Sequence, residues 1–131
     1  MKLNENVVAM LKEQPWYLAT YNEEPNAVPV AFKDVTDDGK LLVGDVFLNT
    51  TLENIKANKK IAVSVSNAAN LEGYQIKGTA EHITEGPIVD TFKKMVEEMF
   101  NGAVTAKGAL VITPEKVIVS TPGEDNNKVL I

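Results

Sequence analysis

The chain has 131 residues, of which 44% are hydrophobic and 24% are charged, and its formal net charge is −5 at pH 7. This length suits one ordinary domain, and this composition excludes a disordered chain. With 13 lysine and arginine residues against 18 acidic ones, the chain has no basic stripe that could neutralise a phosphate backbone, so we expect no nucleic-acid partner.

The sequence contains no cysteine, which removes disulfides, cysteine-ligated metal clusters and thiol nucleophiles from consideration. A reducing compartment fits this usage, so we expect a cytoplasmic protein. No stretch approaches the roughly 18 apolar residues that a membrane span requires, so we expect no membrane partner. We expect one domain over residues 1–131.

The first predicted elements are a helix and a β-hairpin. Apolar residues of segment 3–11 recur at helical spacing, and Pro15 ends this helix. Residues 16–21 and 27–35 are rich in strand formers and are separated by turn-forming residues. Pro29 lies inside the second run, and because proline cannot donate to a strand ladder, it favours an edge strand or a bulge there.

The middle of the chain alternates strands with a short helix. Residues 41–47 predict a third strand, and residues 50–58 predict a helix of about two turns. Residues 59–66 predict the next strand, because its apolar side chains alternate with small ones, which is typical of a strand with one buried face. Residues 74–84 predict a long strand, in which Gly78 indicates a bulge or the close approach of another backbone.

Pro87 opens the longest predicted helix, and Gly102 ends it. Its apolar residues form a wide stripe, which we expect to cover the opening of a sheet or barrel and to bury Met95 and Met99. Two further strands follow, separated by a break at Pro114. Six or seven short strands, mostly joined by tight turns, predict a mainly β fold with flanking helices, built as an antiparallel Greek-key-like barrel rather than a βαβ sheet.

The junction between the third strand and the following helix, residues 47–51, is the main candidate site. The N–H groups and dipole of a helix start favour an anion, and Asn49, Thr50 and Thr51 add donors that could hold a phosphate. The structural alternative is a capping box formed by Thr50 and Glu53, which would satisfy some of these N–H groups internally. The lysines that could bring a counter-charge are Lys33, Lys77 and Lys107.

Other catalytic sites find less support in the sequence. His82 is the sole histidine, and Glu85, three residues further along a strand, would point to the opposite face, so we expect no metal site. The chain lacks the G-x-S-x-G elbow, the G-x-G-x-x-G motif and the P-loop, which argues against acyl transfer and against the usual nucleotide loops. No residue is identified as a dedicated acid or base, so the catalytic residues stay unknown.

A resemblance to a known family is carried by four segments in order: "PNAVPVAFKDV", "FLNTTLENI", "NKKIAVSV" and "GYQIKGTAEHIT". Together they resemble the FMN-binding split-barrel proteins related to pyridoxamine 5'-phosphate oxidase, particularly the small single-domain flavoproteins of that group. The resemblance covers residues 3–123. It implies a six-stranded split β-barrel, a homodimer, and one FMN in each of two clefts at the subunit interface.

The resemblance also implies which residues would hold the cofactor. Residues 28–33 would line the flavin ring and ribityl chain, residues 45–47 would bond the polar edge of the ring through backbone atoms, and residues 49–51 would hold the phosphate. The implied cofactor-binding residues are Pro29, Val30, Ala31, Phe32, Lys33, Asp45, Val46, Phe47, Asn49, Thr50 and Thr51.

The sequence departs from the family at the phosphate turn. Many members carry a lysine immediately before the threonine, where this chain has Asn49. Losing a charge-assisted hydrogen bond costs about 1.5 to 3 kcal/mol, or tenfold and more in affinity, unless Lys33 or Lys77 compensates. If the carboxyl group of Asp45 lay near the flavin ring, it would lower the reduction potential.

The resemblance leaves three functions open. The favoured one is an FMN-dependent oxidoreductase or electron carrier of unknown substrate that acts as a homodimer. The alternative is a non-catalytic split-barrel binding module that has lost flavin. Haem handling, which some split barrels perform, would need His82 at the cleft. Trp16 and Tyr17 either stack on the flavin of a partner subunit or pack in the core, and the apolar end, residues 129–131, is expected to dock on the partner subunit.

Overall fold

The computed structural model describes residues 2–131, which form three helices and seven strands. The helices are α1 (Glu5–Glu13), α2 (Thr50–Asn58) and α3 (Pro87–Met99). The strands are β1 (Trp16–Asn22), β2 (Glu24–Val30), β3 (Lys33–Val35), β4 (Leu41–Asp45), β5 (Lys60–Ser66), β6 (Gly73–Ile83) and β7 (Gly108–Val119). Within this described range, no helix is both long enough and apolar enough to cross a membrane.

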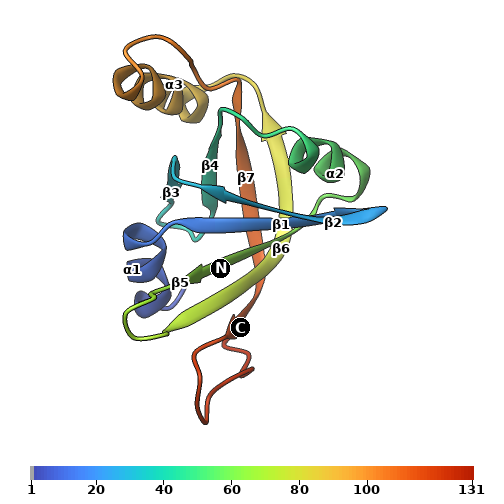
Figure 1. The fold of residues 1–131 in the computed structure, drawn as a ribbon, viewed down its shortest axis with the longest axis vertical. Coiled ribbons are helices and arrows are strands. Elements are labelled where there is room, and N and C mark those ends of the chain that lie inside the picture. Colours follow the sequence, from blue (N-terminus) through green and yellow to red (C-terminus); the bar gives the residue numbers. More distant parts are fainter. Residues whose placement is uncertain (1) are drawn as a thin grey trace.

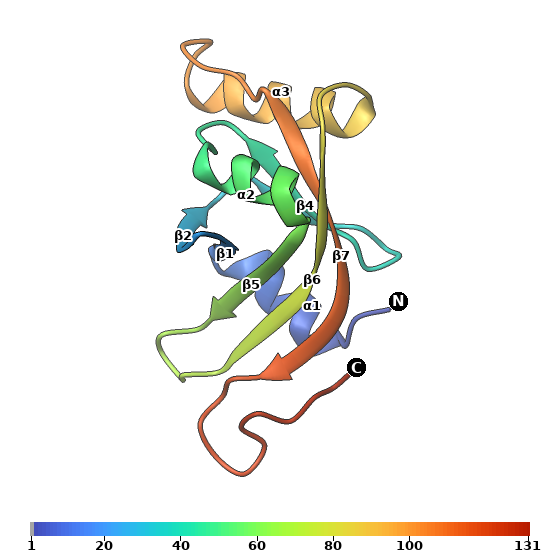
Figure 2. The same ribbon diagram turned by 90° about the vertical axis from the view of Figure 1, so that its right-hand side faces the viewer.

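The strands of residues 2–131 form one antiparallel sheet in the order β2-β1-β5-β6-β7-β4-β3. The sheet is strongly curled, and β6 and β7 arch along most of its length, with α3 at one end and the C-terminal tail at the other (Figures 1 and 2). This architecture confirms the predicted mainly β class with six to seven antiparallel strands and flanking helices.

The segment predicted as one strand over residues 27–35 is divided between β2 and β3. Only Ala31 and Phe32 separate these two strands, yet β2 and β3 are the opposite edges of the sheet. The chain therefore bridges the two edges and closes one side of the curled sheet. Pro29 lies in the edge strand β2, as predicted, because no ladder on the outer side of that strand needs its missing N–H group.

Two apolar clusters form the core. The main cluster fills the inside of the curled sheet, and a smaller one under α3 contains Val89, Phe92 and Val96. The prediction that Met95 and Met99 are buried is wrong, because these side chains are 39% and 68% exposed. Since α3 covers only a small area at one end of the sheet, the outer part of its apolar stripe stays in solvent.

Strand β7 corrects the prediction of two strands separated by Pro114. The strand is continuous, and its register against β6 shifts between Lys77 and Gly78, where Gly78 pairs with Pro114 and Lys77 pairs with Lys116. A bulge of this kind leaves one extra residue on β7 and relieves the ladder at the proline, which has no N–H group to donate. The bulge predicted from Gly78 is confirmed.

Gly78 is also the position where a side chain has least room. A Cβ atom placed there would lie 2.1 Å from the carbonyl oxygen of Thr113. Because both groups belong to paired backbones, a Gly78→Ala variant is expected to lose at least about 1 to 3 kcal/mol of unfolding free energy, which urea unfolding would measure. The control is Lys77→Ala, an exposed neighbour on the same strand, and equal urea midpoints for the two variants would contradict the prediction.

The C-terminal tail lies along its own β7. The N–H group of Leu130 donates to the carbonyl oxygen of Val117 at 2.8 Å, and that of Asn127 donates to Val119 at 2.8 Å. Leu130 packs against the main core, while Val129 and Ile131 are 51% and 42% exposed. Docking of this tail on a partner subunit stays a prediction.

Candidate functional site

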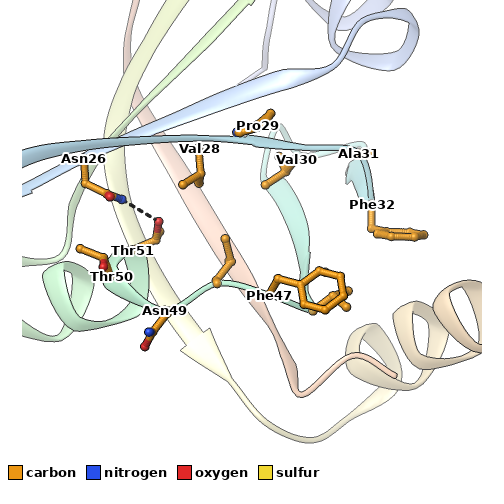
Figure 3. Close-up of a pocket in the computed structure, with 13 residues that line it drawn as sticks. Asn26, Val28, Pro29, Val30, Ala31, Phe32, Phe47, Asn49, Thr50 and Thr51 are labelled. Carbon is orange, nitrogen blue, oxygen red and sulfur yellow. Dashed lines mark hydrogen bonds between the residues drawn. The ribbon is translucent and has the colours of Figure 1, made fainter. Parts of the chain in front are cut away.

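A pocket of about 420 Å³ lies between β2 and the loop that joins β4 to α2, within the size range of small-molecule sites (Figure 3). Ile55 of α2 and Val43 of β4 belong to the main core, and Val28 and Val30 of β2 pack against it. Its lining residues are Asn26, Val28, Pro29, Val30, Ala31, Phe32, Gly44, Val46, Phe47, Leu48, Asn49, Thr50 and Thr51.

The pocket is apolar at one end and polar at the other. Val28 and Val30 point from β2 toward the opposite loop, and Phe32 and Phe47 flank one end (Figure 3). Phe47 is 75% exposed, which leaves a large aromatic surface uncovered beside the opening. The polar end is the start of α2.

The start of α2 keeps its N–H groups available. Asn49 stands at the N-cap but forms no side-chain capping bond in the described part of the chain, whereas at α1 the side chain of Asn4 accepts the N–H of Asn6 at 2.8 Å. Thr50 is the first residue inside the helix rather than its cap, so the capping-box alternative is wrong. The free N–H groups and the positive end of the helix dipole therefore favour an anion at this end of the pocket.

Thr51 connects the two sides of the pocket. Its side chain is almost fully buried, and its hydroxyl oxygen accepts a hydrogen bond from the side-chain amide of Asn26 at 3.1 Å (Figure 3). This bond joins β2 to the first turn of α2. Thr50, in contrast, is exposed and has a hydroxyl that is accessible to a ligand.

The structure brings nine of the eleven predicted site residues together around this pocket: Pro29, Val30, Ala31, Phe32, Val46, Phe47, Asn49, Thr50 and Thr51. The other two, Lys33 and Asp45, do not line it. Their direct contact with a cofactor stays a prediction.

Lys33 contacts the C-terminal end of α1. Its ammonium group donates to the carbonyl oxygen of Leu11 at 2.8 Å and lies 5.4 Å from the ring centroid of Trp16. Burial lowers the pKa of Lys33, and the charge of Asp34 acts in the opposite direction. Trp16 is fully buried and donates its indole N–H to Leu11 at 2.8 Å, so of the two roles considered for this tryptophan the structure supports core packing.

Asp45 and His82 form a pair at the start of the pocket loop, residues 46–49, which joins β4 to α2. The Asp45 side chain is fully buried, and its Oδ2 atom lies 2.9 Å from Nε2 of His82. His82 thus contacts Asp45 and does not line this pocket, and haem handling stays a hypothesis. No group of three or more histidine, cysteine, aspartate or glutamate side chains within residues 2–131 is placed to hold a metal ion.

The three lysines considered as counter-charges lie in different places. Lys77 is exposed on β6 and pairs in register with Lys116 of β7. Lys107, just before β7, donates from its ammonium group to the carbonyl oxygen of Leu48 at 3.1 Å. Lys107 is therefore the lysine that contacts a pocket residue, while Lys33 and Lys77, the replacements favoured by the sequence, do not line the pocket.

Comparison with known proteins identifies the family. The model of the family described as pyridoxamine 5'-phosphate oxidase matches residues 3–124. The chain belongs to the pyridoxamine 5'-phosphate oxidase family. The uncharacterized protein MJ0282 of Methanocaldococcus jannaschii is 31% identical to it, over 99% of this chain and 89% of that protein. The resemblance carried by the four sequence segments is confirmed.

Solved structures with a similar fold agree with this membership of the pyridoxamine 5'-phosphate oxidase family. HupZ of Group A Streptococcus is similar with a TM-score of 0.79 and 25% identity, covering 94% of this chain and 98% of that one. An FMN-binding protein from Syntrophomonas wolfei has a TM-score of 0.80 at 17% identity, covering 92% and 87%, and this second likeness concerns the fold alone. The predicted split-barrel class is confirmed.

Three residues that line the pocket were not predicted from the sequence: Asn26, Gly44 and Leu48. For Gly44 a signal existed, because a glycine inside a strand often marks a close approach. A Cβ atom there would lie 2.8 Å from the ring of Phe92 and 3.2 Å from Cβ of Phe32. Asn26 and Leu48 carried no distinguishing signal, since their places depend on how β2 and the loop meet in space.

Proposed function

We propose that the protein binds FMN in the pocket between β2 and the β4–α2 loop. The phosphate lies at the start of α2, against the N–H groups of its first turn and the side chains of Asn49 and Thr50. The flavin ring lies toward the apolar end, between residues 28–32 of β2 and residues 46–47 of the loop. The single observation that carries this proposal is the uncapped helix start at the polar end of an otherwise apolar pocket.

The residues present suit such a ligand at both ends. Uncapped N–H groups at a helix start supply donors and a positive dipole for an anion without any side-chain charge. Val28, Val30 and Phe32 offer apolar surface on which a planar ring loses contact with water. Membership of the pyridoxamine 5'-phosphate oxidase family and the printed name of the FMN-binding protein from S. wolfei support the same ligand.

Bound flavin would supply the chemistry of taking up and handing on electrons, singly or as hydride. The chain's own residues would bind and orient it and limit the access of water. Because the Asp45 carboxyl group is buried against His82, the protein would influence the ring through backbone groups and apolar walls rather than through an acidic side chain at the ring edge. We therefore propose an FMN-dependent oxidoreductase or electron carrier.

We propose that it acts as a homodimer with flavin at the subunit interface, as the family resemblance implies. The exposed aromatic side chain of Phe47 beside the pocket would then be covered by the partner. The cytoplasmic location stays a prediction from the sequence. A specific observation, Asn49 in place of the turn lysine, favours the second candidate, a binding module that has lost flavin.

Flavin titration tests the proposal. The purified protein, freed of any bound flavin, is titrated with FMN and with riboflavin while flavin fluorescence is recorded, and its mass in solution is measured by light scattering. We expect one FMN per chain, a dimer, and FMN bound about tenfold or more tightly than riboflavin, because only FMN offers the phosphate that the helix start can bind. Flavin fluorescence that rises with added FMN in the same way with and without the protein would refute flavin binding and favour the binding module.

A further inference from the structure

The buried carboxyl group of Asp45 lies at the start of the pocket loop and has no role in the proposed function. The side chain of Asp45 is 0% exposed. Its Oδ2 atom lies 2.9 Å from Nε2 of His82, and its Oδ1 atom lies 3.8 Å from Nζ of Lys107. Within residues 2–131, Oδ1 has no hydrogen-bond partner. Because burying such a group is unfavourable unless its neighbours compensate, this placement calls for an explanation.

Lys107 attaches the pocket loop at both of its ends. Its backbone N–H donates to the carbonyl oxygen of Asp45 at 2.7 Å, and its ammonium group donates to the carbonyl oxygen of Leu48 at 3.1 Å. Val46, Phe47 and Leu48, which line the pocket, lie between or at these two attachment points. The loop conformation therefore depends on where Lys107 is held.

His82 completes the support from the opposite strand, and Gly108 makes room for it. A Cβ atom at Gly108 would lie 2.8 Å from Nε2 of His82 and 2.4 Å from the carbonyl oxygen of Ile83. The absence of a side chain at this position lets the imidazole ring reach Asp45 beside the start of β7. Asp45 pairs in register with Gly108, so three segments of the chain meet at the carboxyl group.

Lys107 also places a positive charge close to the proposed phosphate site. Consecutive Cα atoms are 3.8 Å apart, and Leu48 precedes the first helical residue, Thr50, by two positions. The ammonium group bonded to Leu48 thus lies within about 10 Å of the helix start, which is about the distance over which an exposed charge acts at 0.1 M salt. The Lys107 side chain is 55% exposed, so water and salt reduce the attraction of its charge for the phosphate.

We propose that Asp45, His82 and Lys107 form a positioning network that holds residues 46–49 in the conformation that binds flavin, with Lys107 as its cation. This inference rests on the proposed function for its effect on flavin, but not for its effect on the loop. Asp45 orients the ammonium group of Lys107, and His82 fixes the carboxyl group of Asp45. Lys107 then holds the loop through its hydrogen bonds to Asp45 and Leu48. None of the three has to touch the ligand.

Two pairs of variants test the network. His82→Ala removes the partner of Asp45, and His82→Gln keeps an N–H donor at a similar position. Lys107→Met removes the cation, and Lys77→Met is its matched control, since Lys77 is an exposed lysine on β6. For each variant, FMN and riboflavin affinities are measured, and hydrogen exchange of the amides of residues 46–49 is followed without flavin.

We expect His82→Ala to bind FMN about tenfold more weakly and to exchange the loop amides faster, with His82→Gln restoring both to within about threefold of the wild type. Lys107→Met should weaken FMN more than riboflavin, and Lys77→Met should change neither. If His82→Ala unfolds, His82→Gln and Lys107→Met still decide the matter. Loop exchange and FMN affinity unchanged in Lys107→Met would overturn the network.

The exchange measurement separates this inference from the proposed function. If the wild type binds no flavin, the proposed function fails, and the network is then judged on the loop alone: faster exchange at residues 46–49 in His82→Ala supports it, and unchanged exchange overturns it. If the wild type binds FMN and all variants bind it equally well, the network fails while the proposed function stands.

Discussion

A Thr50→Glu variant is expected to bind FMN between about fivefold and more than a hundredfold more weakly than the wild type. Thr50 is exposed and is the first residue of α2, so the added carboxylate would stand beside the proposed phosphate. Two unit charges about 5 Å apart repel each other by about 1 to 3 kcal/mol at effective dielectric constants between 80 and 20. Titration of the flavin fluorescence measures the loss.

This substitution is chosen so that the fold survives it. An acidic residue in the first turn of a helix is favourable to the helix itself, whereas glutamate at Thr51 would have to enter a site that is almost fully buried and bonded to Asn26. Thr50→Gln is the neutral control of similar size, and it should bind FMN nearly as well as the wild type. Riboflavin affinity should be nearly equal in both variants. Undiminished FMN binding by Thr50→Glu would show that the helix start does not hold the phosphate.

A Trp16→Ala variant is expected to lose about 3 to 5 kcal/mol of unfolding free energy, the usual cost of removing a large aromatic side chain from a core. Trp16 is 0% exposed and donates its indole N–H to Leu11. Its loss would leave a cavity in the main cluster and remove the ring beneath the ammonium group of Lys33. Urea unfolding followed by circular dichroism measures the change, since the variant has no tryptophan left to report by fluorescence.

The exposed neighbour provides the matched comparison. Tyr17→Ala removes an aromatic side chain that is 51% exposed on the other face of β1, and it should cost less than half as much stability. If Tyr17→Ala lowers flavin affinity and Trp16→Phe does not, the role in flavin stacking belongs to Tyr17. A Trp16→Ala protein as stable as the wild type would contradict the assignment of this residue to the core.

Most of the fold was predictable because local signals agreed with the final structure. The alternation of Ile61, Val63 and Val65 predicted β5, and all three side chains are buried. The bulge at Gly78 was predicted because a glycine inside a strand often marks a bulge or a close approach of another backbone. The division of β2 from β3 was not predictable, since it depends on which strand each half pairs with, and no local pattern encodes that choice.

The candidate site was predicted in its chain segments but not in its side-chain orientations. The family resemblance pointed to residues 28–33, 45–47 and 49–51, and most of them meet at one pocket. Lys33 and Asp45 turn away because each finds a partner distant in sequence, Leu11 for the lysine and His82 for the carboxyl group. Sequence spacing gives no information on such contacts, and so the role of Lys107 in the loop was also not evident.

The two-residue connection between β2 and β3 has a mechanical consequence. Ala31 and Phe32 belong to the pocket wall and also tie together the two margins of the sheet. Lys33, the next residue, is anchored to the end of α1, and Phe32 accepts the N–H of Gly44 at 2.8 Å. Because this wall is attached at several points, we expect it to keep its position when a ligand enters through the opening beside Phe47.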